Sequence, residues 1–100
     1  MLKSVHSSHN ETFLKLLRRR RVSMGLRQKD LAVRIGRGQG TVSKVERGER
    51  RLDVIELRAW LRALDLDFAT FARDLDQELL AFPIPELNIH TLPARRHRIV

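Results

Sequence analysis

Hydrophobic residues recur at helical spacing in the first segment of the chain, between two signals for the ends of a helix. Ser8 followed by Glu11 has the spacing of a capping box, with Asn10 as a rival cap, so a helix is expected to begin near residue 9. Its apolar positions are Phe13, Leu14, Leu17, Val22 and Met24. Gly25 stands where a left-handed residue commonly ends a helix.

Two short helices are predicted next. From Gln28 the apolar residues form a single stripe, and Gly36 follows it as a C-cap. A second stripe follows the turn at residues 37–38, and Gly48 ends it. The apolar positions of the two segments are Leu31, Ala32 and Ile35, then Val42 and Val45.

Two longer helices complete the pattern. Asp53 caps a helix that is expected to run to about Asp65, and Asp67 caps a fifth. Their inner positions are Leu57, Trp60, Leu61 and Leu64, then Phe68, Phe71, Ala72, Leu75 and Leu79. Pro83 and Pro85 end the helical part, because proline cannot continue a helix. Residues 86–92 alternate weakly between polar and apolar and are interpreted as a short strand.

These elements predict an all-α fold in one domain, since a chain of 100 residues can bury one modest core. We assign residues 1–9 to an N-terminal arm, residues 10–80 to the helical domain and residues 81–100 to a C-terminal tail. The tail has two interpretations. Its arginines, Arg95, Arg96 and Arg98, add non-specific attraction to phosphate, or its apolar residues, Leu87, Ile89 and Leu92, join a second subunit. The second is slightly favoured, because the helices leave few spare apolar residues for a symmetric dimer.

Residues 28–47 meet the physical requirements of a helix-turn-helix, in which two short helices cross at a steep angle through a tight turn. Ala32 provides the small side chain that close helix contact needs, and Gly36 provides a turn residue that tolerates positive φ. The buried face of the pair is expected to be Leu31, Ile35, Val42 and Val45. Six constrained positions in one short window make chance agreement improbable.

With these residues the sequence resembles the Cro and lambda-repressor type of helix-turn-helix proteins, the XRE family. The resemblance covers about residues 16–80 and is carried by RVSMGLRQKDLA, the turn at Gly36, TVSKVERG and ALDLD. It implies a compact five-helix, lambda-repressor-like domain that binds operator DNA as a dimer, with the third helix in the major groove.

The resemblance also implies roles for individual residues. The base-reading positions fall on Gln39, Gly40, Ser43 and Lys44. Glutamine can bond to adenine and lysine to guanine in the major groove, which suits Gln39 and Lys44. We interpret Gly40, an unusual residue inside a helix, as allowing the backbone to approach a base edge.

The phosphate contacts are expected from Gln28, Arg37, Arg47, Arg50 and Arg51, which would set register without reading sequence. The run Arg18 to Arg21 spans a full helical turn, so at least one of its side chains must point inward. The family pairs an arginine at the place of Arg21 with a glutamate at the place of Glu46, so these two are expected to form a structural ion pair.

Charge is distributed unevenly along the chain. The net charge is +8, and residues 1–52 carry fourteen Lys and Arg against four Asp and Glu, a net +10. Residues 53–80 carry three against seven, a net −4. The basic half, which contains the helix-turn-helix, is expected to face an anionic partner, and the resemblance implies that this partner is double-stranded DNA. The acidic stretch is expected to serve as scaffold or as a surface for a protein partner.

Other chemistry finds little support. Without cysteine the chain forms no disulfide and no thiolate metal site. His6 and His9 lie far from the remaining histidines, so no metal site is expected. No phosphate loop or nucleophile elbow occurs, so we expect no catalytic residues, no cofactor and no enzymatic activity. No apolar stretch is long enough to span a bilayer. The prediction is a soluble cytoplasmic protein of bacterial or phage origin, associated with the nucleoid.

The leading hypothesis is a transcriptional regulator, in particular a repressor, that binds a palindromic operator as a homodimer with recognition helices about 34 Å apart. The alternative is an antitoxin that binds its own operator and uses the acidic fifth helix or the tail to bind a toxin. A third interpretation is a basic amphipathic protein at a membrane surface. The compact pattern of Ala32, Gly36 and Val42 argues against it.

Overall fold

The computed structural model describes the backbone of residues 5–82 and the side chains of residues 8–82. Five helices and no strand occur in this range. They are α1 (Val5–Ser23), α2 (Gln28–Ile35), α3 (Gln39–Glu46), α4 (Val54–Ala63) and α5 (Phe68–Leu79). The predicted all-α fold is confirmed, and the interpreted strand at residues 86–92 lies outside the described residues.

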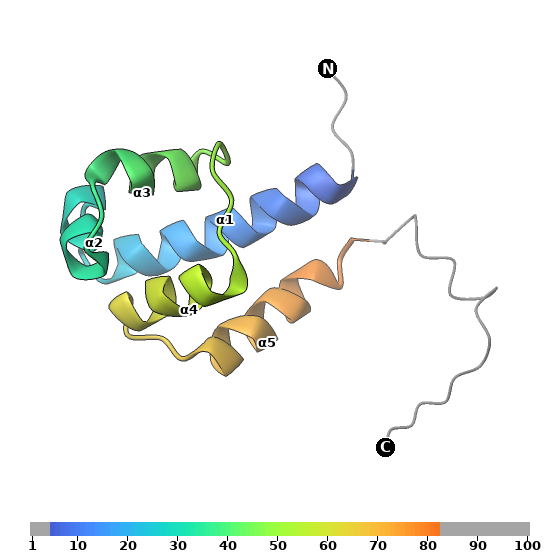
Figure 1. Ribbon diagram of the computed structural model, residues 1–100. Helices are drawn as coiled ribbons and strands as arrows, with labels where there is room; N and C mark the ends of the chain where they lie inside the picture. Colours follow the sequence, from blue (N-terminus) through green and yellow to red (C-terminus); the bar gives the residue numbers. More distant parts are fainter. Residues whose placement is uncertain (1–4, 83–100) are drawn as a thin grey trace.

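The helices surround a single core (Figure 1). The short helices α2 and α3 pack on one another at one end, α5 packs against the longer α1, and α4 packs against α2 and α5. The buried hydrophobic residues are Leu17, Leu31, Ala32, Val42, Val45, Trp60, Leu61, Leu64 and Phe71, all of which were expected on inner faces. Phe13 of α1 meets Phe71 of α5 edge to face, with ring centroids 5.9 Å apart. Burial of these side chains supplies the main favourable term in folding.

Three of the predicted helix ends are confirmed. The Asp53 carboxylate accepts the Glu56 N–H at 2.7 Å and begins α4, and the Asp67 carboxylate accepts the Thr70 N–H at 3.0 Å and begins α5. Gly36 ends α2 with φ 68°, a left-handed conformation that glycine adopts without steric cost.

The expected start of α1 near residue 9 is wrong, because the helix already begins at Val5. Ser8 does not cap it and instead lies inside it, where its carbonyl accepts a hydrogen bond from the Thr12 hydroxyl at 3.1 Å. No glycine or proline interrupts the preceding residues, so the helix continues through the capping signal. Within this helix, the His9 ring lies against Phe82, with centroids 5.5 Å apart. Part of the expected N-terminal arm is therefore helical.

Three residues expected on inner faces lie at the surface instead. Val22 is 57% exposed and Phe68 is 37% exposed, and Ala72 is exposed as well. Arg21 follows Leu17 by four residues, so it takes the inward position on α1 and turns Val22 outward. On α5 the inner stripe is centred on Phe71 and Leu75, so Phe68 and Ala72 lie at the edge of this stripe.

Among residues 5–82, no helix combines the length and the apolar character that a bilayer crossing requires. Over the described side chains, no three histidine, aspartate or glutamate residues come together as a metal site would need.

Candidate nucleic-acid interface

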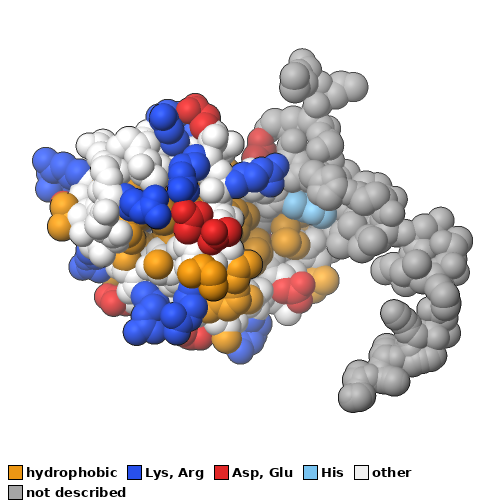
Figure 2. Space-filling view, in the orientation of Figure 1, with side chains coloured by type: hydrophobic (Ala, Val, Ile, Leu, Met, Phe, Trp, Pro, Cys, Tyr) orange, Lys and Arg blue, Asp and Glu red, His pale blue; other side chains and the backbone are white. Residues whose placement is uncertain are grey.

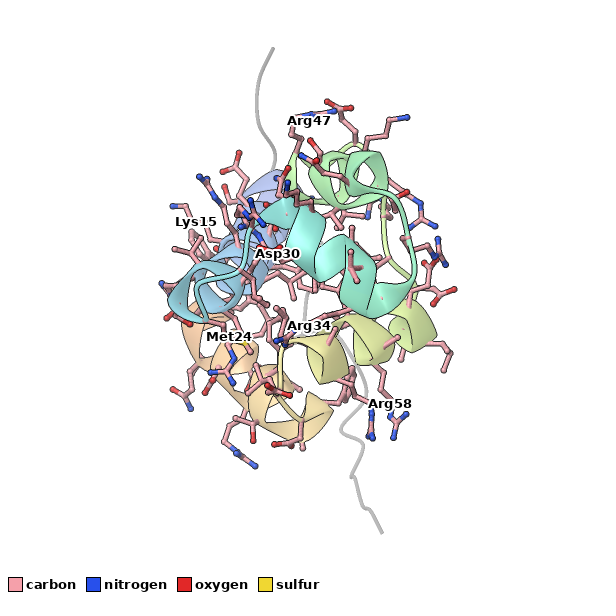
Figure 3. All side chains as sticks on the ribbon, turned by 90° about the vertical axis from the view of Figure 1, so that its left-hand side faces the viewer. Lys15, Met24, Asp30, Arg34, Arg47 and Arg58 are labelled. Atoms are coloured by element: carbon pink, nitrogen blue, oxygen red, sulfur yellow. The ribbon has the colours of Figure 1, made fainter. Side chains whose placement is uncertain are left out.

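The turn between α2 and α3 is built from the backbone. The N–H of Arg37 bonds back to the carbonyl of Ala32 at 2.9 Å, across the left-handed Gly36. Gly38 then has an extended backbone and serves as the N-cap of α3. On the inner side of the pair, Ala32 and Val42 are almost completely buried. The inner face of α3 is thus fixed to α2, and its outer face remains at the surface, as the side-on view in Figure 3 shows.

The four expected base-reading residues share this outer face. Gln39, Gly40 and Lys44 are exposed, and Ser43 is half-buried. The hydroxyl oxygen of Ser43 accepts a hydrogen bond from Arg47, one turn further along. Apart from the backbone of α3 and the two chain neighbours, no heavy atom lies within 4 Å of the place where a Cβ on Gly40 would stand, so there is open space on this side of the helix. Their contact with bases stays a prediction.

Three of the four expected phosphate-binding arginines are already paired with carboxylates. Arg47 donates to both oxygens of Glu49 from its Nε and Nη2 atoms, at 2.8 and 3.1 Å. Glu56 is shared, since Arg50 Nη2 lies 2.8 Å and Arg37 Nη2 lies 3.5 Å from its Oε2. On the face shown in Figure 2, red acidic side chains accordingly lie directly against blue basic ones.

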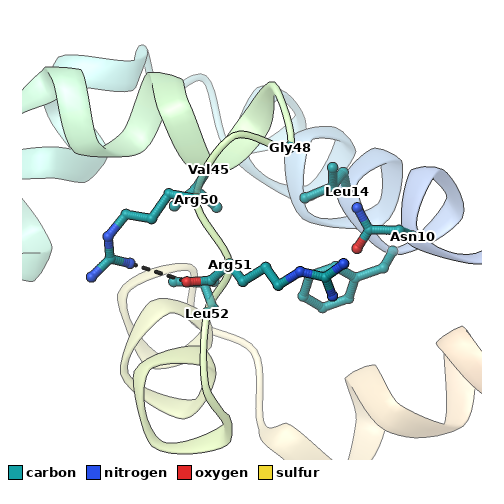
Figure 4. A pocket seen from close by; sticks show the side chains of 8 residues that line it. Asn10, Leu14, Val45, Gly48, Arg50, Arg51 and Leu52 are labelled. Atoms are coloured by element: carbon teal, nitrogen blue, oxygen red, sulfur yellow. Dashed lines mark hydrogen bonds between the residues drawn. The ribbon is translucent and has the colours of Figure 1, made fainter. Parts of the chain in front are cut away.

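Arg51 stands apart from these arginines. Figure 4 shows Arg50 and Arg51 leaving the backbone in opposite directions, joined only by a hydrogen bond from Arg50 to the Arg51 carbonyl at 3.3 Å. The Arg51 side chain extends toward Asn10 of α1 and borders a pocket of about 80 Å³. The expected phosphate-binding group therefore divides into arginines beside α3 and one that reaches toward α1.

A buried network lies beneath the interface. Arg21 donates to Glu46 from two nitrogens, at 2.7 Å from Nε to Oε2 and at 3.0 Å from Nη2 to Oε1, and also to the carbonyl of Leu26 at 2.7 Å. The side-chain amide of Gln28 donates to the same Oε1 at 2.9 Å. The structure thus contains the expected pair of Arg21 and Glu46. One amide hydrogen of Gln28 points into this network, and the other remains for the expected phosphate contact.

Comparison with known proteins shows the family to which this helix-turn-helix chain belongs. Residues 17–71 match the helix-turn-helix family. An XRE-family-like protein from Pseudomonas syringae pv. tomato str. DC3000 is 39% identical, with a TM-score of 0.70 over 74% of this chain and 90% of that one. The chain belongs to the XRE family of DNA-binding helix-turn-helix regulators. The resemblance seen in the sequence is therefore confirmed.

More distant solved structures share the fold. The wild-type restriction-modification controller protein C.Esp1396I is 23% identical, with a TM-score of 0.67 over 73% of this chain and 95% of that one. The clp gene regulator ClgR from Corynebacterium glutamicum is 22% identical, with a TM-score of 0.64 over 73% of this chain and 78% of that one. Among curated proteins, none matches the chain.

Two structural features of this XRE domain escape sequence reasoning. Arg20 donates to the carbonyls of Leu64 and Asp65, at 3.0 and 2.9 Å, and so satisfies the C-terminal end of α4. Arg34 does the same for Ala63 at 2.9 Å. Partners so far apart along the chain leave no local sequence signal. Arg20 therefore joins Arg21 as part of the scaffold.

Three carboxyl groups around the XRE helix-turn-helix have lowered pKa values, which favour their charged form. The bidentate hydrogen bonds from Arg47 lower the pKa of Glu49, and the hydrogen bond from Arg50 lowers the pKa of Glu56. Hydrogen bonds from the side chain and backbone of Arg27 lower the pKa of Asp30 to about 2. These groups are anionic at neutral pH and offset part of the positive charge beside α3.

Proposed function

We propose that this protein is a transcriptional repressor that binds a palindromic operator as a homodimer and catalyses no reaction. The observation that carries the proposal is the outer face of α3, where Gln39 and Lys44 are exposed beside the open backbone of Gly40. Hydrogen-bonding side chains on an exposed helix are what readout of a major groove requires. Binding of this kind takes place in the cytoplasm, on the DNA of the nucleoid.

The scaffold supports a rigid reading surface. Val42 and Val45 anchor the inner side of α3, and the network of Arg21 and Glu46 ties the end of α3 to α1. A recognition helix held in this way presents its outer residues in a fixed geometry, which lowers the entropy lost on binding. Repression would follow from occlusion of RNA polymerase.

Solved relatives of the fold support an operator as the partner. One of them is the restriction-modification controller protein C.Esp1396I as a tetramer in complex with its natural 35 base-pair operator, 24% identical to this chain. A palindromic operator matches the two-fold symmetry of a dimer, which places two copies of α3 about one DNA turn apart.

Selection of bound sequences from random duplexes, at two salt concentrations, tests the proposal. We expect a palindromic consensus whose half-sites are centred about 10 base pairs apart. Equal binding of all sequences with a steep dependence on salt would leave only phosphate attraction and would refute sequence-specific repression. Lys44→Gln should lower affinity for the consensus about tenfold or more, while Lys15→Gln on α1 removes the same charge and serves as the control.

Light scattering tests the dimer. We expect the full chain to be a dimer and a chain lacking residues 83–100 to be a monomer. An intact dimer after this deletion would refute the role predicted for the tail. The toxin partner of the antitoxin alternative stays a prediction, and co-purification of a second small protein would test it.

A further inference from the structure

The arginines beside α3 share one property that their proposed role in DNA binding does not require. Each has a carboxylate of this chain on its guanidinium group. Carboxylate and phosphate bind guanidinium in the same way, through two parallel N–H bonds. An arginine whose paired N–H groups face a carboxylate therefore has to exchange this partner before it can offer the same groups to phosphate.

We propose that Glu49 and Glu56 limit the affinity of this protein for DNA by occupying the arginines that contact phosphate. The inference rests on the proposed function, because it takes Arg37, Arg47 and Arg50 as the phosphate contacts. It adds that two acidic residues act against binding and determine how strongly the basic surface attracts DNA of any sequence.

Glu49 and Glu56 occupy their arginines in different ways. The side chain of Glu49 is 55% exposed and pairs with Arg47, so it can turn away into water when phosphate arrives. Exposed pairs of this kind have little net stability, which makes the exchange inexpensive.

Glu56 is held in place. Its side chain is 25% exposed, and its Oε1 accepts the backbone N–H of Asp53 at 3.0 Å as part of the capping box of α4. Arg50 donates one hydrogen bond to its Oε2 at 2.8 Å, and Arg37 lies 3.5 Å from the same oxygen. Because this carboxylate is anchored, the two arginines are the groups that turn toward phosphate. One fixed carboxylate thus holds two arginines, and its removal should have the larger effect.

Three variants that each remove one negative charge test the inference. Glu49→Gln and Glu56→Gln release the arginines, and glutamine at position 56 can still form the capping box. Glu78→Gln is the control, since Glu78 lies on α5 and pairs only loosely with Arg19, at 3.8 Å. Affinity for a duplex of arbitrary sequence is measured by fluorescence anisotropy over a series of salt concentrations, and thermal unfolding checks that each variant is folded.

We expect Glu49→Gln and Glu56→Gln to bind about two- to fivefold more tightly than the control at low salt. The slope of log affinity against log salt should become steeper by up to about 0.9 for each arginine released. Affinities equal to that of Glu78→Gln would overturn the inference. Weaker binding would overturn it too, because it would mean that the carboxylates position the arginines for DNA.

A double-variant experiment distinguishes the release of Arg47 by Glu49→Gln from the general effect of removing one negative charge. In an Arg47→Gln background, Glu49→Gln should no longer tighten binding beyond the control, since the guanidinium that it would release is absent. If Glu49→Gln still raised the affinity for DNA in this background, the effect would come from the net charge of the protein, and the inference that Glu49 acts by occupying Arg47 would be refuted. Wild-type protein that binds no duplex would instead refute the proposed function itself.

Discussion

Arg21 of α1 and Glu46 of α3 form a two-pronged ion pair with only 9% and 6% of their side chains exposed. The same Glu46 oxygen accepts from Gln28 at the start of α2, so one carboxylate joins three helices beneath the reading face. Water does not screen such a pair, and its partners depend on one another for charge compensation.

Removal of one partner should therefore be costly. We expect Glu46→Gln to lower the free energy of unfolding by about 3 to 5 kcal/mol, because it leaves the Arg21 charge buried without compensation. Urea denaturation measures the change, and Arg19→Gln, which breaks the exposed contact with Glu78, should stay within about 0.5 kcal/mol of wild type. A double variant, Arg21→Met with Glu46→Leu, should recover much of the loss. Similar small effects for both single variants would contradict the structural role of the pair.

Gly40 gives a prediction in which stability and binding move in opposite directions. Its Cβ position is open, so Gly40→Ala fits without a clash and should stabilise α3 by up to about 1 kcal/mol through helix propensity. If the backbone approaches a base edge at this position, the added methyl group should weaken operator binding. Parallel measurements of thermal unfolding and operator affinity decide the matter. An unchanged affinity for the operator would refute the interpretation that the backbone at Gly40 approaches a base edge.

Gly36 tests the turn between α2 and α3. Its φ of 68° is strained for residues with a Cβ, although the space around that Cβ position is empty. Gly36→Ala should therefore destabilise the protein by about 1 kcal/mol through the backbone alone. Gly36→Asn should cost less, because asparagine tolerates the left-handed conformation better. Equal stability of the two variants, followed by chemical denaturation, would speak against this explanation.

Acid should destabilise the protein through Asp30. Hydrogen bonds from the side chain and backbone of Arg27 hold the pKa of this carboxyl at about 2, below its usual 3.8. A depressed pKa means that the folded state binds the proton less readily than the unfolded state, so the stabilisation is present above pH 3.8 and is lost as the pH falls toward 2.

Asp30→Asn should therefore flatten the decline of the melting temperature in this pH range. It should not abolish the decline, because the pKa values of Glu49 and Glu56 are lowered as well, by Arg47 and Arg50 respectively. Identical pH profiles for wild type and Asp30→Asn would show that the contact with Arg27 does not persist in solution.

Features that depend on neighbours along the chain could be predicted from the sequence. Asp53 and Asp67 begin helices because their carboxylates bond backbone groups three residues away, and Gly36 ends one because of its own φ. The helical repeat also identified every residue that is buried in the core. The local signal gave the wrong helix start at Ser8, because the preceding residues continue the helix and the capping pattern lies inside it.

The sequence by itself determined the five helices, the turn at Gly36 and the residues that α3 turns outward, since backbone conformation and side-chain periodicity are local properties. Apart from the pair of Arg21 and Glu46, which the family resemblance implied, only the tertiary structure decided which charges meet. It directs Arg20 to the end of α4, Val22 to the surface, and Glu56 to the arginines beside α3. These outcomes depend on distances between segments far apart in the chain, and long arginine side chains reach whichever acceptor the packing of helices brings near.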